Sequence, residues 1–195
     1  MAVPASADAL AAVRAEAMAC TRCGLAAGRT QVVFGVGDPA ADLMFVGEGP
    51  GREEDLRGEP FVGRSGQLLD RLMVEELGRD RSHFYVANVV KCRPPHNRDP
   101  RPEEIVACRP FLTAQLDLVD PVVVMTLGNF ATRELLGTTE GIRRVRGRAY
   151  PFGRGHLVPT YHPAAALRSG GEVVAEMRAD FVRAKRLLLA AQGSR

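Results

Sequence analysis

Four cysteines are the first residues whose spacing predicts chemistry. Two flank the TR dipeptide of a CTRC segment and two lie far downstream, at Cys20, Cys23, Cys92 and Cys108. A CxxC pair with two distant thiols supplies the four ligands that tetrahedral zinc or an iron–sulfur cluster needs. Because all-thiolate ligation suits both, the spacing leaves the choice between them open. Isolated buried thiols and a redox-active CxxC are the remaining interpretations, and a disulfide is disfavoured in a reducing cytosol.

Three further segments carry polar side chains at the ends of short apolar stretches. They are GEGPGREED at 47–55, NVVKCR at 88–93 and YHPAAALR at 161–168. In open α/β sheets a ligand binds beyond the carboxyl ends of the strands, where such loops converge. We therefore expect the three segments to surround one site.

The stretches that position these residues alternate between two hydrophobic patterns, which predicts strands and helices in turn. We expect strands within 43–51, 84–90, 121–128 and 156–163. We expect helices at 6–18, 63–77, 102–119, 129–137 and 172–192. The first helix ends just before Cys20 and so delivers the CxxC pair on a turn. This order predicts an α/β fold, a three-layer α/β/α sandwich with a central, mostly parallel four-stranded sheet.

Length and composition predict one domain over 1–195, because 195 residues that are 46% hydrophobic suffice to bury a core. The sequence lacks an apolar run of membrane-spanning length and a signal-peptide layout, so we expect a cytoplasmic protein with no membrane partner. The net charge of +3 does not by itself indicate a polyanion partner. Basic residues nevertheless gather in two stretches, which indicates either a phosphate-binding surface or a solvated arginine-rich one. They are Lys91, Arg93, Arg98, Arg101 and Arg109, followed by Arg143, Arg144, Arg146 and Arg148.

Four motifs, taken in order, resemble those of the family 4 uracil-DNA glycosylases across nearly the whole chain. They are CTRC, GEGPGREEDLRGEPFVGRSGQLLD, NVVKCRPPHNRDPRPEEIVACRPFL and YHPAAALR. The resemblance implies the α/β/α glycosylase fold and a DNA repair enzyme that flips uracil out of DNA and hydrolyses its N-glycosidic bond, leaving an abasic site. It also implies a 4Fe-4S cluster on the four cysteines, with 1–25 as an N-terminal helix and turn that supply two ligands. We expect a monomer that acts on uracil-containing DNA, associated with the nucleoid, and no redox step in catalysis.

The resemblance also assigns residues to the uracil pocket. Gly47 and Gly49 belong to a loop whose backbone comes close to the ligand, because no side chain intrudes. Phe61 matches the aromatic residue that stacks on the base. Asn88 matches the residue that reads uracil, since a carboxamide can donate to O4 and accept from N3–H. Taken without the family pattern, Phe61 fits an ordinary core residue and Asn88 fits a structural residue at a turn.

The same resemblance assigns the chemical step. His162 is expected beside O2 of the leaving base, where a donor stabilises the developing anion. Glu48 resembles the carboxylate that positions water and stabilises the cationic sugar. Glu54 or Asp55 is expected to exclude thymine by crowding its 5-methyl group, and the sequence does not choose between them.

DNA contacts are expected from two segments. Leu167 and Arg168 correspond to a loop that enters the minor groove and fills the gap left by the base. Arg93 belongs to the basic stretch between the last two cysteines, which is expected to grip phosphates, with the cluster shaping that loop.

Three alternatives stay open at this level. A sister group joins covalently to the abasic sugar through a histidine, and His96 lies in the corresponding region although the basic insert of that group is absent. A non-catalytic iron–sulfur module that binds DNA is the second alternative, and a zinc protein of unrelated activity is the third.

Overall fold

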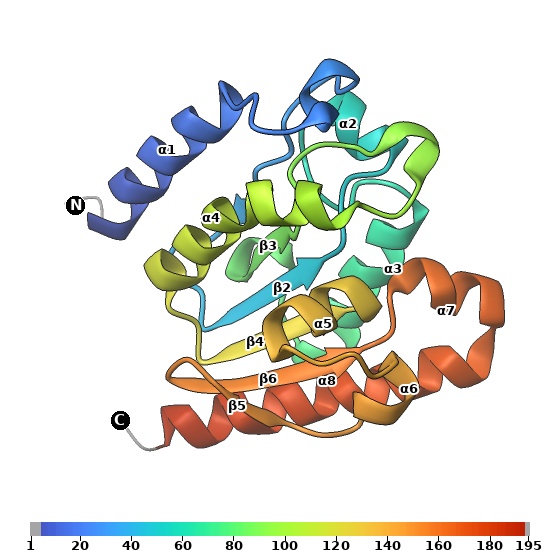
Figure 1. Cartoon of the computed structure of the whole chain (residues 1–195). Helices are drawn as coiled ribbons and strands as arrows, with labels where there is room; N and C mark the ends of the chain where they lie inside the picture. The colour runs from blue at the N-terminus through green and yellow to red at the C-terminus, as the bar shows by residue number, and fades with distance from the viewer. Residues whose placement is uncertain (1–4, 194–195) are drawn as a thin grey trace.

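The computed structural model describes residues 5–193, and its centre is a six-stranded sheet of order β1-β3-β2-β4-β6-β5 (Figure 1). The strands are β1 (Val36–Gly37), β2 (Leu43–Gly47), β3 (Tyr85–Asn88), β4 (Val123–Leu127), β5 (Tyr150–Phe152) and β6 (Gly155–Thr160). The inner four strands, β3, β2, β4 and β6, run parallel, and they are the four that the sequence predicts. The edge strands β1 and β5 pair antiparallel to their neighbours and were not predicted. Both are shorter than the runs of four to eight residues from which a strand can be recognised.

Helices cover both faces of the sheet, as expected for three layers (Figure 1). The α-helices are α1 (Ala5–Met18), α2 (Arg52–Arg57), α3 (Arg64–Leu72), α4 (Pro102–Val119), α5 (Asn129–Leu136), α6 (Ile142–Val145), α7 (Pro163–Ser169) and α8 (Gly171–Gln192). A π-helical turn, η2 (Met73–Leu77), extends α3, and 3-10 turns occur at η1 (Gly24–Ala27), η3 (Arg81–His83) and η4 (Pro95–Asn97). Within 5–193, no helix combines the length and hydropathy that a membrane crossing demands.

Strand β2 shows how the sequence produces the layers. All five of its residues are buried, because alternate side chains point to opposite faces and both faces are covered. Leu43 and Phe45 join a core with α3 and α8, where Leu69 and Phe181 are fully buried. Met44 and Val46 join a second core that includes side chains of α1, α4 and α5.

The carboxyl ends of the parallel strands lie side by side at one edge of the sheet. Gly47 at the end of β2 is paired with Asn88 at the end of β3, and Leu127 of β4 is paired with Thr160 of β6. The loops that follow these residues therefore start next to one another. Such an edge is where open α/β sheets bind their ligands.

Two short helices, α2 and α7, lie where the sequence predicts a loop and the end of a strand. The predicted last strand ends at Thr160, and Pro163 instead starts α7, because proline suits the first helical position and His162 caps it. Helix α2 follows the glycine-rich loop directly, and a hydrogen bond from the Gly51 N–H to Glu54 closes its first turn.

Candidate active site

A cavity of about 570 Å³ opens where the carboxyl ends of the parallel strands meet. Its volume is in the range of small-molecule sites. The structure brings the three predicted polar segments together around it. The predicted residues in its wall are Glu48, Gly49, Glu54, Phe61, Asn88, His162 and Arg168.

Gly47 lies directly behind two of these residues. A Cβ built at Gly47 would lie 2.4 Å from Asn88 Oδ1 and 2.5 Å from Phe61 Cζ. Real Cβ atoms do not approach other atoms so closely, so only glycine lets the amide and the ring pack against this strand end.

Asn88 presents an unpaired polar atom at the cavity. Its side chain is 2% exposed, and Oδ1 has no hydrogen-bond partner within the described part of the chain. Burying a polar atom without a partner is unfavourable, and such exceptions are rare in folded proteins. The amide oxygen is therefore arranged to accept a hydrogen bond from a ligand.

His162 is held as a neutral donor by the start of α7. Its Nδ1 accepts the Ala164 N–H at 3.2 Å. Burial, with a smaller contribution from Arg168, lowers the pKa of the imidazole to about 4, although Glu54 opposes the shift. In the neutral ring with Nδ1 as acceptor, the proton is on Nε2. The Phe61 ring lies beside this imidazole.

Glu48 follows β2 directly and behaves unlike a surface carboxylate. Burial raises its pKa to about 7, and the negative charge of Asp99 contributes in the same direction. Asp99 lines the same cavity, on the segment between the last two cysteines. A carboxyl group with this pKa changes charge near neutral pH, which suits general base catalysis or water activation.

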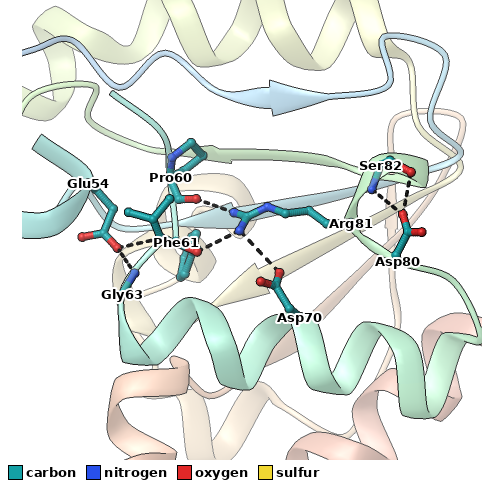
Figure 2. A network of polar contacts seen from close by, with 9 residues as sticks. Glu54, Pro60, Phe61, Gly63, Asp70, Asp80, Arg81 and Ser82 are labelled. Carbon is teal, nitrogen blue, oxygen red and sulfur yellow. Dashed lines mark hydrogen bonds and ion pairs between the residues drawn. The ribbon is translucent and has the colours of Figure 1, made fainter. Parts of the chain in front are cut away.

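Glu54 and Asp55 face different surroundings, although they are adjacent in the sequence. Glu54 reaches the cavity, and its carboxylate accepts main-chain N–H groups from Gly51, Val62 and Gly63 at 3.0 to 3.1 Å. Figure 2 shows the bond to Gly63. Asp55 is 3% exposed and accepts the Thr30 N–H at 2.9 Å, outside the cavity wall. The structure therefore does not bring Asp55 to the cavity, because successive residues of a helix point in different directions.

All four cysteines line one small second cavity. Cys20 and Cys23 reach it from the turn after α1, Cys92 from the loop after β3, and Cys108 from α4, against which α1 packs. Two sulfur atoms accept hydrogen bonds: Cys108 Sγ from the Lys91 N–H at 3.2 Å, and Cys92 Sγ from Arg29 at 3.4 Å. Among the described residues, no three His, Cys, Asp or Glu side chains are close enough to ligate a single metal ion.

Part of the predicted phosphate-binding surface is already occupied by other contacts. Lys91 is 1% exposed, and its Nζ donates to the Asn88 carbonyl at 2.7 Å. The prediction that Lys91 belongs to a phosphate-binding surface is therefore wrong. Arg98 pairs with Glu104, Arg109 with Glu134, and Arg146 with Glu176 and Asp180. The Arg146 guanidinium also lies 5.3 Å from the Tyr161 ring centroid. Sequence alone cannot distinguish a cation that binds phosphate from one that is paired inside the fold.

The expected DNA-contacting residues lie at or near the cavity mouth. Leu167 is 42% exposed, and Arg168 is exposed and lines the cavity. Arg93 is half-buried and donates to Asn97 at 2.7 Å. His96 is exposed on the adjoining turn and is not part of the cavity wall.

Several further residues in the cavity wall had no predicted role, among them Asp99, Asn129 and Tyr161, although Tyr161 lies in the predicted YHPAAALR segment. Asn129 lies two residues after the end of β4 and Tyr161 directly follows the end of β6, so the rule that ligands bind at strand ends was a sufficient signal for them. Asp99 follows no predicted element, and no local pattern marks it.

Comparisons with known proteins agree with this geometry. Residues 34–187 match the model of the Uracil DNA glycosylase superfamily. The type-4 uracil-DNA glycosylase of Thermotoga maritima is 47% identical over 152 residues, which is 77% of this chain and 79% of that protein. The type-4 enzyme of Sulfurisphaera tokodaii is 44% identical over 168 residues, which is 82% of this chain and 76% of that protein. A type-5 uracil-DNA glycosylase of Thermus thermophilus is 34% identical over 176 residues, 80% of each chain.

Proposed function

Because this chain belongs to the uracil-DNA glycosylase superfamily and, within it, to the type-4 uracil-DNA glycosylases, we propose that it removes uracil from DNA. The bond between uracil N1 and sugar C1′ is hydrolysed, which leaves an abasic site. The observation that carries this proposal most directly is the buried, unpaired amide oxygen of Asn88 in the wall of the strand-end cavity.

Recognition of the base starts with its extrusion from the stack, since the glycosidic bond is hidden inside a duplex. In the cavity, Asn88 Oδ1 accepts from uracil N3–H and Nδ2 donates to O4. Cytosine presents the opposite pattern at both positions and leaves the buried amide unpaired. Sites of this kind reject the wrong partner strongly because unpaired buried groups are unfavourable. Phe61 supplies the apolar surface on which the base stacks.

Departure of the base leaves the electron pair of the broken bond on uracil. His162 is placed to stabilise this anion, because its neutral imidazole carries the proton on Nε2 and donates it in a hydrogen bond to O2. A neutral donor that is already oriented needs no rearrangement as charge develops.

The sugar becomes cationic in the same step. Ionised Glu48 stabilises that charge and orients the water whose oxygen bonds to C1′, and the proton that this water loses passes to the Glu48 carboxylate or to solvent. Glu54 is the remaining candidate for excluding thymine. Its carboxylate is held by three main-chain N–H groups and so forms a rigid part of the wall.

The exposed Leu167 fits a wedge that fills the space left in the duplex, as apolar side chains commonly do. Arg168 and Arg93 are proposed to contact phosphates beside it. We propose that the chain acts as a monomer on uracil-containing DNA, in the cytoplasm at the nucleoid.

We propose that the four cysteines around the second cavity, Cys20, Cys23, Cys92 and Cys108, hold a 4Fe-4S cluster. Cysteine thiolates are the usual ligands of such a cluster, and all four cysteines line this one cavity. The N–H groups donated by Lys91 and Arg29 suit negatively charged sulfur. When bound, the cluster would supply a structural cross-link that ties 1–25 to the rest of a single domain over 1–195.

The direct test is hot-alkali cleavage of a labelled duplex after incubation with the enzyme, using matched duplexes that carry uracil, thymine or hypoxanthine at one position. We expect strand scission at uracil and none at thymine, and loss of scission in Asn88→Ala and His162→Ala. His83→Ala, an exposed histidine outside the cavity, is the matched control and should cleave normally. Binding without scission would overturn the proposal in favour of a non-catalytic module. A protein–DNA band on a denaturing gel that disappears in His96→Ala would favour the covalent alternative.

A further inference from the structure

Phe61 has a backbone conformation that its own side chain disfavours. Its φ is +55°, in the left-handed region where the Cβ of a non-glycine residue is crowded. Conformations of this kind persist only where the surrounding contacts hold them, and they are concentrated at functional sites. The loop from Pro60 to Gly63 must therefore be fixed by groups outside it.

The N–H groups of this loop are held by Glu54, as described above. Its carbonyl groups are held by Arg81. Arg81 Nη1 donates to the Phe61 carbonyl at 2.8 Å, and Nη2 donates to the Pro60 carbonyl (Figure 2). On the other side of the Phe61 carbonyl lies Gly66 of α3, where a Cβ would approach its oxygen to 1.7 Å. The Phe61 carbonyl is thus held by Arg81 and packed closely against Gly66.

Arg81 is itself held in place and lies outside the cavity wall. It starts the η3 turn, which Asp80 caps by accepting the Ser82 N–H at 2.9 Å. Figure 2 shows its side chain extended from this turn to the Pro60 and Phe61 carbonyls, with Asp70 of α3 alongside at 3.4 Å. The next element along the chain is β3, which ends at Asn88.

We propose that Arg81 is a positioning residue for uracil cleavage, which acts from outside the cavity by fixing the Pro60–Gly63 loop and hence the Phe61 ring. This inference rests on the proposed glycosylase function. Two rigidly spaced nitrogen donors are needed to hold two successive carbonyl groups, and the planar guanidinium provides them. A lysine has a single nitrogen at the end of a flexible chain and can replace this arrangement only in part.

A double-mutant cycle with Phe61 tests the proposal, because Arg81 should matter only through the ring it positions. The rate of uracil excision is measured under single-turnover conditions for wild type, Arg81→Gln, Phe61→Ala and the double variant. We expect Arg81→Gln to slow excision about tenfold or more, since a small misplacement of a group that contacts the substrate lowers the reaction rate strongly. In the Phe61→Ala background the same change should slow it by less than about twofold.

Two further variants separate positioning from general stability. Arg81→Lys should recover part of the lost rate. Asp70→Asn removes the partner carboxylate while leaving both carbonyl bonds, and should excise uracil at nearly the wild-type rate. Binding of a duplex with a stable abasic-site analogue should be the same in all Arg81 variants, because no base is present for Phe61 to contact.

The outcomes are distinguishable. If wild type excises no uracil, the proposed function fails. If wild type excises uracil and folded Arg81→Gln or Arg81→Lys does so equally fast, the positioning role is overturned. An equal loss of rate in the wild-type and Phe61→Ala backgrounds would also overturn it. If Arg81→Gln does not fold, the cycle is run with Arg81→Lys, with the same two criteria.

Discussion

The ring of Phe61 lies 5.6 Å from the imidazole of His162, centroid to centroid, with the two planes tilted by 33°. The two residues are far apart in the sequence. Phe61 lies in the loop before α3, and His162 lies in the turn before α7. Their proximity places a hydrogen-bond donor beside the surface on which a base stacks. Base binding and stabilisation of the leaving group are therefore arranged in one corner of the cavity.

Gly47→Ala should disrupt this corner without unfolding the protein. The new Cβ would lie 2.4 Å from Asn88 Oδ1 and 2.5 Å from Phe61 Cζ, well inside normal contact, so both side chains must move. We expect excision to fall about a hundredfold, measured by single-turnover cleavage of uracil DNA. Gly171→Ala is the control, because a Cβ there meets nothing within 4 Å. Equal rates for the two variants would contradict the proposed packing.

The pH dependence of kcat/KM should report Glu48. Burial and Asp99 raise the pKa of this carboxyl to about 7, and the ionised form is the active one. Activity should therefore rise with pH through about 7 and level off above it, as kcat/KM follows the free enzyme. Asp99→Asn removes a negative neighbour, so the rising limb should move to lower pH. Asp117→Asn, an exposed aspartate outside the cavity wall, should leave the limb in place. A limb that does not move in Asp99→Asn would argue against Glu48 as the titrating group.

His162 should be neutral across the working pH range, with its proton on Nε2. Its pKa is lowered to about 4, so protonation occurs only in acid, well below the pH at which Glu48 ionises. Nitrogen-15 NMR of labelled histidine at pH 7 should show the Nε2–H tautomer for this residue, because Nδ1 accepts the Ala164 N–H. Replacement by alanine should slow excision about 10²- to 10³-fold, the usual effect of removing a donor to a developing anion. A cationic imidazole at pH 7 would contradict this description.

Cys92→Ser should remove visible absorbance and iron, and should loosen the N-terminal segment. The cluster would cross-link segments that are far apart in the chain, so its loss should lower Tm by roughly 5 to 15 °C. Thr21→Ser, an exposed change inside the CTRC segment, should keep both the colour and the Tm. Purified wild-type protein that contains zinc in place of iron would contradict the cluster assignment.

The parts of the fold that the sequence predicts are those with long, regular hydrophobic patterns. The four parallel strands and the long helices α1, α4 and α8 are of this kind, and their order implies the layers. The edge strands β1 and β5 are too short for such a pattern. Helices α2 and α7 depend on single capping contacts, from Glu54 and from His162, that no periodicity reveals.

Within the site, the rule that ligands bind at strand ends brings Glu48, Asn88 and His162 together correctly, because each follows or ends a buried strand. Asp55 lies outside the cavity wall and Lys91 is buried, neither of which the sequence indicates, for a physical reason. The direction of a helical side chain and the burial of a cation are decided by tertiary contacts. The contacts of Arg81 and Asp99 are tertiary in the same way and carry no local signal.

The most direct test of the central claim is a crystal structure of the enzyme with a uracil-containing duplex, trapped by Glu48→Gln. We expect an extruded uracil in the strand-end cavity, stacked on Phe61, with Asn88 at N3 and O4 and His162 Nε2 at O2. A uracil that remains stacked in the duplex, or binds with its O4 edge away from Asn88, would contradict it.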